Sequence, residues 1–272
     1  MEAKAAVAQQ GKTTEWKLIV FLFGCNLLAS FMQSIMNIAL DQVASEFHIH
    51  LAEANLVIIA FSIVAGTVIT TAASVMKRFG LRKVMLFGLA CGFTGSLLGC
   101  FAWCFPVMVV ARVIQAITTG LYFPVINEAL LVLSPKGKAG VLLSVNSGVI
   151  GVGLAFAPPI AGVVLTYAGL RPLFLVPVVL SAVLFILGLF VVHDIVGRED
   201  RPIDGISILL SFLGLGLFMT GLNEVSHYGW PMVALMGAGL AVSGLFIWRQ
   251  CRIQHPLLDL RPFKSGLLIS PI

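Results

Sequence analysis

Arg112 and two polar residues on the same predicted helix face are the first groups in this sequence that could do chemistry. Arg112 lies within an apolar stretch, and Gln115 and Thr119 follow it at spacings of three and seven residues. A cation at the centre of a membrane helix costs roughly 2.5–3.5 kcal/mol on insertion scales. In an aqueous cavity such a residue can handle a proton, an anionic group or a partner carboxylate. Alternatively it snorkels to the outer surface, because Pro106 is only six residues away.

A second set of polar residues lies in the first and fourth apolar stretches. Gln33 and Asn37 are four residues apart, so a helix places them on one face that can line a cavity. Hydrogen bonding between helices is the alternative role for this pair. Asn127 and Glu128 stand at the inner end of the fourth stretch. Glu128 is expected at the cytoplasmic interface, where partial burial would suit it to proton exchange.

Enzymatic chemistry has no residues to carry it. The sequence contains no cluster of metal ligands, no nucleophile elbow and no phosphate-binding loop, so we predict no catalytic activity, no metal and no cofactor. The five cysteines include no Cys-x-x-Cys pair. Cys100 and Cys104 flank a short predicted turn and could bridge, but we expect them to act as small apolar residues.

Eight apolar stretches must position these groups. The chain is 59% hydrophobic and only 11% charged, with a mean hydropathy of +1.03, whereas soluble domains carry about 25% charged residues. A helix needs about 20 apolar residues to cross a bilayer. We therefore predict an all-α polytopic membrane protein. The expected spans are Leu18–Ala39, Leu56–Met76, Val84–Cys104, Pro106–Asn127, Val141–Tyr167, Leu173–Val192, Ile206–Leu222 and Pro231–Trp248.

Basic residues give the expected orientation. If the spans alternate, fifteen of the 17 Lys and Arg residues fall on one side, including Lys77, Arg78, Arg82 and Lys83 between the second and third spans. Positively charged loops are retained in the cytoplasm, so the N-terminus is predicted to be cytoplasmic and the protein to be a multi-pass protein of the cell membrane. The net charge of +5 follows from this topology and from attraction to anionic lipids, and it requires no nucleic-acid partner.

Charge also divides the chain into segments. A cytoplasmic tail (1–17) precedes a six-helix bundle (18–192), and the most charged stretch (193–205) is expected to link the bundle to two further helices (206–248). The remaining segment (249–272) is expected to be cytoplasmic and ends in GLLISPI, which is typical of the start of a ninth span. Seven residues cannot cross a bilayer, so we expect this sequence to be a piece of a longer protein whose C-terminal half is absent.

The fifth apolar stretch is rich in small residues. Gly153, Ala157 and Ala161 recur at four-residue spacing, which gives a nearly flat face that lets another helix approach closely. Pro158 and Pro159 remove two backbone donors from the same helix, so a kink is predicted there.

Five segments in this order resemble the major facilitator superfamily, and specifically its fourteen-helix drug:proton antiporters. MKRFGLRKVMLFG, which contains Gly80, resembles the loop motif that helps to hold the inner gate. ARVIQAITTGLYFP is similar to the fourth-helix motif through Arg112 and Gln115. GLAFAPPIAG, together with the preceding Gly148 and ending at Gly162, resembles the antiporter motif of the fifth helix. MNIALD resembles the end of helix one, and HYGW with HPLLDLRPF resembles the two extra central helices and their exit.

The resemblance implies alternating access between two six-helix halves, with a small organic substrate and protons as partners. It places Arg112 and Gln115 in the transport pathway, and we add Glu128 as a candidate for the proton relay. The chain departs from the family pattern at two carboxylates: Lys77 stands where the loop motif has an acidic residue, and Met32 where helix one has one. Glu128 is then the main acidic candidate for proton coupling in these spans, and a residue in the missing half is the other.

Three functions remain open at this point. The resemblance implies proton-driven export of amphipathic drugs or other small organic compounds. Lys77 and Met32 are also consistent with a proton-independent facilitator or a symporter. The third alternative is a non-transporting membrane protein or an inactive fragment.

Overall fold

The computed structural model describes residues 2–135, 137–195, 197, 204–253 and 257. In this part of the chain, eight helices are long and apolar enough to cross a membrane, which confirms the predicted number and the all-α class. The helices are α1 (Glu2–Glu46), α2 (Leu51–Ala54), α3 (Leu56–Phe79), α4 (Leu81–Cys100), α5 (Phe105–Leu133), α6 (Ala139–Ala168), α7 (Leu170–Leu173), α8 (Leu175–Val191), α9 (Gly205–Tyr228) and α10 (Trp230–Gln250).

Several helices extend beyond the predicted spans. α1 runs to Glu46, beyond the predicted end at Ala39, so Asp41 is an exposed residue of this helix. α5 continues past Asn127 to Leu133. α4, in contrast, ends at Cys100. A helix satisfies its backbone hydrogen bonds internally, so it can continue into the headgroup region beyond its apolar residues.

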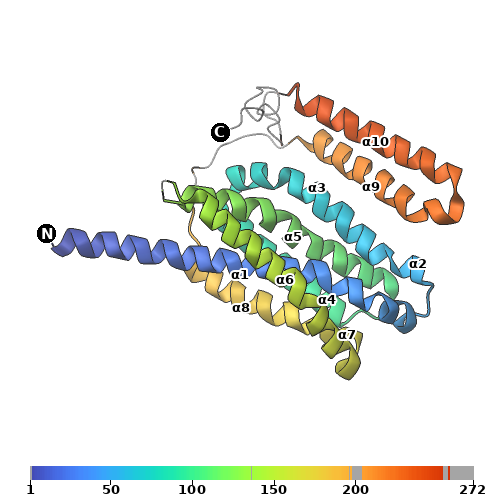
Figure 1. Ribbon diagram of the computed structural model, residues 1–272, viewed down its shortest axis with the longest axis horizontal. Coiled ribbons are helices and arrows are strands. Elements are labelled where there is room, and N and C mark those ends of the chain that lie inside the picture. Colours follow the sequence, from blue (N-terminus) through green and yellow to red (C-terminus); the bar gives the residue numbers. More distant parts are fainter. Residues whose placement is uncertain (1, 136, 196, 198–203, 254–256, 258–272) are drawn as a thin grey trace.

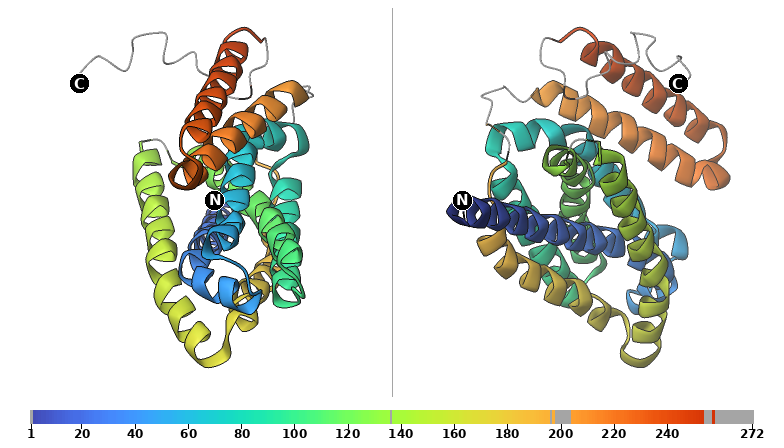
Figure 2. Two further views of the ribbon diagram at one scale, coloured as in Figure 1. Left: turned by 90° about the vertical axis from the view of Figure 1, so that its right-hand side faces the viewer. Right: turned by 60° about the vertical axis from the view of Figure 1, so that its left-hand side comes forward.

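Six long helices form one bundle, and the α9–α10 hairpin lies at its edge (Figure 1). Within the bundle α5 packs against α3 and α4, α1 packs against α6, and α8 packs against α4 and α1. Both further views show the hairpin against α3 (Figure 2). Asn55, just before α3, donates a hydrogen bond to Asn223 of α9, and Thr70 contacts Ser211 at 3.4 Å. The hairpin is therefore attached to the bundle through α3.

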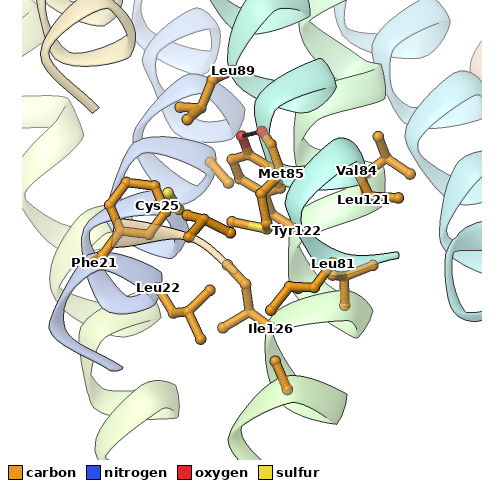
Figure 3. Packing of buried hydrophobic residues seen from close by; sticks show 14 of the residues in the cluster. Phe21, Leu22, Cys25, Leu81, Val84, Met85, Leu89, Leu121, Tyr122 and Ile126 are labelled. Atoms are coloured by element: carbon orange, nitrogen blue, oxygen red, sulfur yellow. Dashed lines mark hydrogen bonds between the residues drawn. The ribbon is translucent and has the colours of Figure 1, made fainter. Parts of the chain in front are cut away.

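We call the end of the bundle that carries the basic loop between α3 and α4 the basic end. The hydrophobic core at this end joins α1, α4 and α5. Figure 3 shows Phe21, Leu22 and Cys25 of α1 facing Met85 of α4 and Tyr122 of α5, and all five are buried. The Tyr122 hydroxyl donates to the Met85 carbonyl oxygen at 2.7 Å. A buried hydroxyl must find such a partner, so this bond fixes the register between α4 and α5.

An ion pair joins the two helices of the hairpin at their basic end. Asp204 caps the N-terminus of α9 by accepting from the Ile206 backbone N–H, and it also accepts from Ser207 at 2.6 Å. Arg249 of α10 donates to the same carboxylate at 2.9 Å and 3.2 Å. The hydrogen bond from Arg249 lowers the pKa of Asp204, so the pair stays ionised at neutral pH.

Two sequence predictions have a limited outcome here. α6 runs without interruption through Pro158 and Pro159, and the kink stays a prediction. The predicted start of a ninth span (266–272) and part of the charged linker (198–203) lie outside the described residues.

Candidate functional site: a buried arginine network and the loop between α3 and α4

Arg112 lies inside the bundle with 1% of its surface exposed. Its Nη1 donates to the Met32 carbonyl oxygen at 2.9 Å and to Gln115 Oε1 at 2.8 Å. Its guanidinium carbon is 4.2 Å from the centroid of the Phe61 ring, a cation–π geometry. The snorkelling alternative is therefore wrong, because the side chain points into the protein and joins α5 to α1 and α3.

The charge of Arg112 is balanced in an unusual way. Among the described residues, no carboxylate forms a salt bridge with it, and its Nε has no hydrogen-bond partner. Met32, which replaces the acidic residue of the family pattern, offers only its backbone carbonyl. The cation is thus held by two neutral oxygens and an aromatic ring.

The other members of the predicted polar stripe extend the network to α4 and α1. Gln115 is fully buried and donates from Nε2 to Ser96 Oγ at 2.8 Å. Ser96 in turn donates to the Gly92 carbonyl oxygen at 2.6 Å. Thr119 Oγ1 contacts the Ala29 carbonyl oxygen at 3.3 Å. Sequence reasoning missed Ser96 and Phe61, since a single hydroxyl or ring in an apolar helix gives no sign of its partner.

Lys77, the departure from the family loop motif, forms an ion pair with Glu128. Lys77 Nζ, near the end of α3, is 3.4 Å from Glu128 Oε1 on α5, with side chains 38% and 27% exposed. An ion pair so accessible to solvent contributes about 0–1 kcal/mol. Lys77, which stands where the family motif has an acidic residue, therefore contacts Glu128, the main candidate for proton coupling. The pair joins α3 to α5.

The rest of the loop motif is fastened to the end of α8. Gly80 has φ +86°, a conformation that favours glycine, and it forms the turn between α3 and α4. The Arg82 backbone N–H donates to Asp194 Oδ1 at 2.9 Å, and its guanidinium donates to the Leu189 carbonyl oxygen at 2.9 Å. Asp194 therefore acts as an anion at the N-terminus of α4.

The remaining motif residues, Arg78 and Lys83, are exposed at the same end. Asp194 itself was missed by sequence reasoning. Its only signal was its place in the most charged stretch of the chain.

Three asparagines form a chain across the bundle. Asn26 of α1 donates to Asn146 Oδ1 of α6 at 2.8 Å, and Asn146 donates to Asn127 Oδ1 of α5 at 2.9 Å. Asn26 and Asn146 are buried, whereas Asn127 is exposed. Gln33 and Asn37 are also exposed, on α1. Exposure is what a cavity-lining role requires, but the role of these three residues stays a prediction.

α6 has two different small-residue faces. A Cβ at Gly153 would lie 2.7 Å from Ser30 Cβ, so this glycine allows α6 to pack closely on α1, together with the buried Ala157 and Ala161. Around Gly148 and Gly162, in contrast, no described atom lies within 4 Å of an added Cβ. Pro158 is half-buried and Pro159 is exposed. One face of α6 is therefore packed, and the other is open.

Solved transporters share this fold. The proton:xylose symporter XylE aligns with a TM-score of 0.58 at 13% identity, covering 95% of this chain and 57% of that structure. The POT family transporter PepTSo aligns with a TM-score of 0.59 at 14% identity, covering 85% of this chain and 52% of that structure.

Curated relatives are similar along nearly all of this chain. Lincomycin resistance protein LmrB of Bacillus subtilis is 25% identical over 278 residues, covering 99% of this chain and 57% of the relative. Drug efflux pump JefA of Mycobacterium tuberculosis is 27% identical over 267 residues, covering 95% of this chain and 52% of the pump. The chain thus spans about half the length of the curated relatives it matches.

A family model described as Major Facilitator Superfamily matches residues 22–270. This match begins within α1 and includes the other seven membrane helices that the structure describes. The chain therefore belongs to the major facilitator superfamily, a family of membrane transporters and not of enzymes, as the sequence predicted.

Proposed function

We propose that this chain belongs to the fourteen-helix drug:proton antiporters and takes part in proton-driven export of amphipathic drugs or other small organic compounds. The observation that carries the proposal is the similarity along nearly the whole chain to proteins named for drug resistance and efflux. Besides LmrB and JefA, these include a tetracenomycin C resistance and export protein of Streptomyces glaucescens, 27% identical over 246 residues. In this proposal the protein lies in the cell membrane, with the basic ends of its helices in the cytoplasm, as the distribution of Lys and Arg predicts.

In this proposal the six-helix bundle (18–192) is one half of the transporter, the charged segment (193–205) links it to the two extra helices (206–248), and residues 249–272 lead into a second half. The peripheral position of the α9–α10 hairpin against α3 supports this division (Figure 1). The open face of α6 around Gly148 supports it too, because small residues let a helix of the second half approach closely.

Alternating access assigns a different role to the exposed polar side chains, to the buried arginine and to the ion pair between α3 and α5. Gln33, Asn37 and Asn127 line the substrate cavity, since they are exposed on α1 and α5. Arg112 supplies a fixed positive charge behind this surface. Glu128 exchanges the proton: when its carboxylate binds a proton, the ion pair with Lys77 is lost, and α3 and α5 are free to separate at the basic end.

Proton coupling is tested in everted membrane vesicles that carry the chain, with an amphipathic fluorescent dye as substrate. Dye accumulation is expected when a pH gradient is formed and to stop when nigericin collapses it. The control variant is Lys138→Gln. Lys138 is an exposed basic residue just before α6 that takes no part in the arginine network or the ion pair between α3 and α5. Accumulation that survives nigericin would favour the facilitator. No accumulation beyond that of empty vesicles would favour the non-transporting alternative.

Exchanging the two charges tests the pair between α3 and α5. Lys77→Glu places two carboxylates together, so we expect dye export to fall by about five-fold, the equivalent of about 1 kcal/mol for an exposed pair. The double variant Lys77→Glu with Glu128→Lys restores the attraction with reversed polarity and is expected to recover export. If the double variant is as impaired as the single one, the pair does not act as a unit.

A further inference from the structure

A narrow apolar slot opens on the bundle between α3 and α4, with α5 as its floor. Its volume is about 460 Å³. Val68, Val75 and Phe79 line it from α3, Lys83 and Phe87 from α4, and Leu121 from α5. Leu121 belongs both to this lining and to the core described above, where it lies across from Phe21 in Figure 3. It takes no part in the polar networks described above.

The walls of the slot offer almost nothing to water. Among the described residues that line it, Thr71 is the only uncharged polar one, and its hydroxyl already donates to the Val68 carbonyl oxygen at 2.9 Å. A site needs two or more free polar partners to hold a water molecule well. Hydrocarbon is therefore the filling that suits this slot.

The length of the slot corresponds to one leaflet of a bilayer. Val68 and Phe79 are eleven residues apart on α3, which is about 16 Å at 1.5 Å per residue. The hydrocarbon core of a bilayer is about 30 Å thick, so the slot extends from the basic end to about the midplane. This length matches one acyl chain and is too short for a helix that spans the membrane.

Positive charge lies at the mouth of the slot. Lys83 lines it directly, and the Arg78 guanidinium stands 5.7 Å from the centroid of the Phe79 ring, which forms the wall at the same end. Phe79 and Phe87 are 44% and 57% exposed, so the mouth is aromatic as well as basic. Aromatic and basic side chains together are typical of the headgroup level of a membrane.

We propose that this slot binds one anionic phospholipid of the cytoplasmic leaflet. One acyl chain fills the slot between α3 and α4, and the phosphate of the headgroup is held by Lys83 and Arg78. The choice of an anionic lipid follows from the charge at the mouth, and the choice of leaflet from the predicted cytoplasmic position of the basic end. The site is separate from the proposed substrate cavity, so lipid binding there does not depend on which compound is transported.

The test measures lipid retention by the purified chain in detergent, using native mass spectrometry with equal amounts of a palmitoyl-oleoyl phosphatidylglycerol and the matching phosphatidylcholine. One molecule of phosphatidylglycerol is expected to be retained in preference. Lys83→Gln is expected to weaken that preference by about five-fold, the effect of one basic residue near the membrane surface. Lys138→Gln, at the same end but away from the slot, is expected to leave it unchanged.

A second variant tests the acyl-chain part of the site. Phe87→Ala removes an exposed wall residue, so the chain should still fold, and it is expected to lower retention of both lipids. Equal retention of the two lipids by the unmodified chain would overturn the proposal, because it would indicate ordinary surrounding lipid. Equal effects of Lys83→Gln and Lys138→Gln would overturn it as well, because they would indicate diffuse surface attraction.

Discussion

Arg112→Ala is expected to reduce transport at least about 100-fold while the chain still inserts and folds. The substitution removes both hydrogen bonds of Nη1 and the contact with the Phe61 ring. It leaves Gln115 Oε1 without the donor from which it accepts. Each buried polar group left unpaired costs about 1–3 kcal/mol. Removing a cation that has no carboxylate partner recovers roughly 2.5–3.5 kcal/mol of insertion cost. These opposing effects nearly cancel in stability, so the loss is expected in function.

The measurement compares dye export in everted vesicles with helicity and thermal unfolding of the purified variants. Arg112→Lys is the matched control for charge: it keeps the cation but cannot reproduce the two-oxygen geometry, so partial export is expected. Arg112→Met keeps much of the volume without charge and is expected to fold but not to transport. Export by Arg112→Ala at the unmodified level would show that the buried cation has only a structural role.

Gly120→Leu is expected to prevent the bundle from folding. An added Cβ at this position would lie 2.6 Å from Val68 Cβ and 2.7 Å from the Ala65 backbone oxygen. The backbone of α3 cannot yield as a flexible side chain can, so α3 and α5 must move apart. Overpacking typically costs 1–3 kcal/mol, and a whole leucine against backbone exceeds that range. We expect aggregated protein in size-exclusion chromatography and a large loss of protein in the membrane.

Gly148→Leu is the matched control, because no described atom lies within 4 Å of a Cβ added there. The purified chain is expected to fold as the unmodified chain does. If the open face of α6 receives a second bundle, as proposed, this variant loses export while keeping its stability. Normal yield and stability of Gly120→Leu would show that α3 and α5 are less tightly packed than the structure indicates.

Much of the fold was accessible from sequence because lipid imposes strict conditions on a chain. Every span must be long and apolar, so the eight helices were found, although their ends were not. The polar stripe was found because helical periodicity alone places Arg112, Gln115 and Thr119 on one face. Its burial could not be decided, since Arg112 lies close enough to the predicted helix end for either outcome.

The contacts between helices were beyond sequence reasoning. Nothing in the spacing of Lys77 and Glu128 indicates that they lie 3.4 Å apart. Lys77 was interpreted as a departure from the family pattern, and Glu128 separately as a candidate for proton coupling. Their pairing depends on how far α3 slides along α5, which is set by close packing at Gly120 and not by either charge. The Met32 carbonyl is a similar case, because a backbone atom leaves no trace in residue type.

The carboxylate of Asp194 at the start of α4 imposes an order on biosynthesis. It lies 112 positions after Arg82, whose backbone it binds, so the ribosome has translated six membrane helices before this contact can form. Until Asp194 is synthesised, the first turn of α4 lacks this carboxylate partner. The loop between α3 and α4 therefore gains this contact only after the last helix of the bundle has been synthesised.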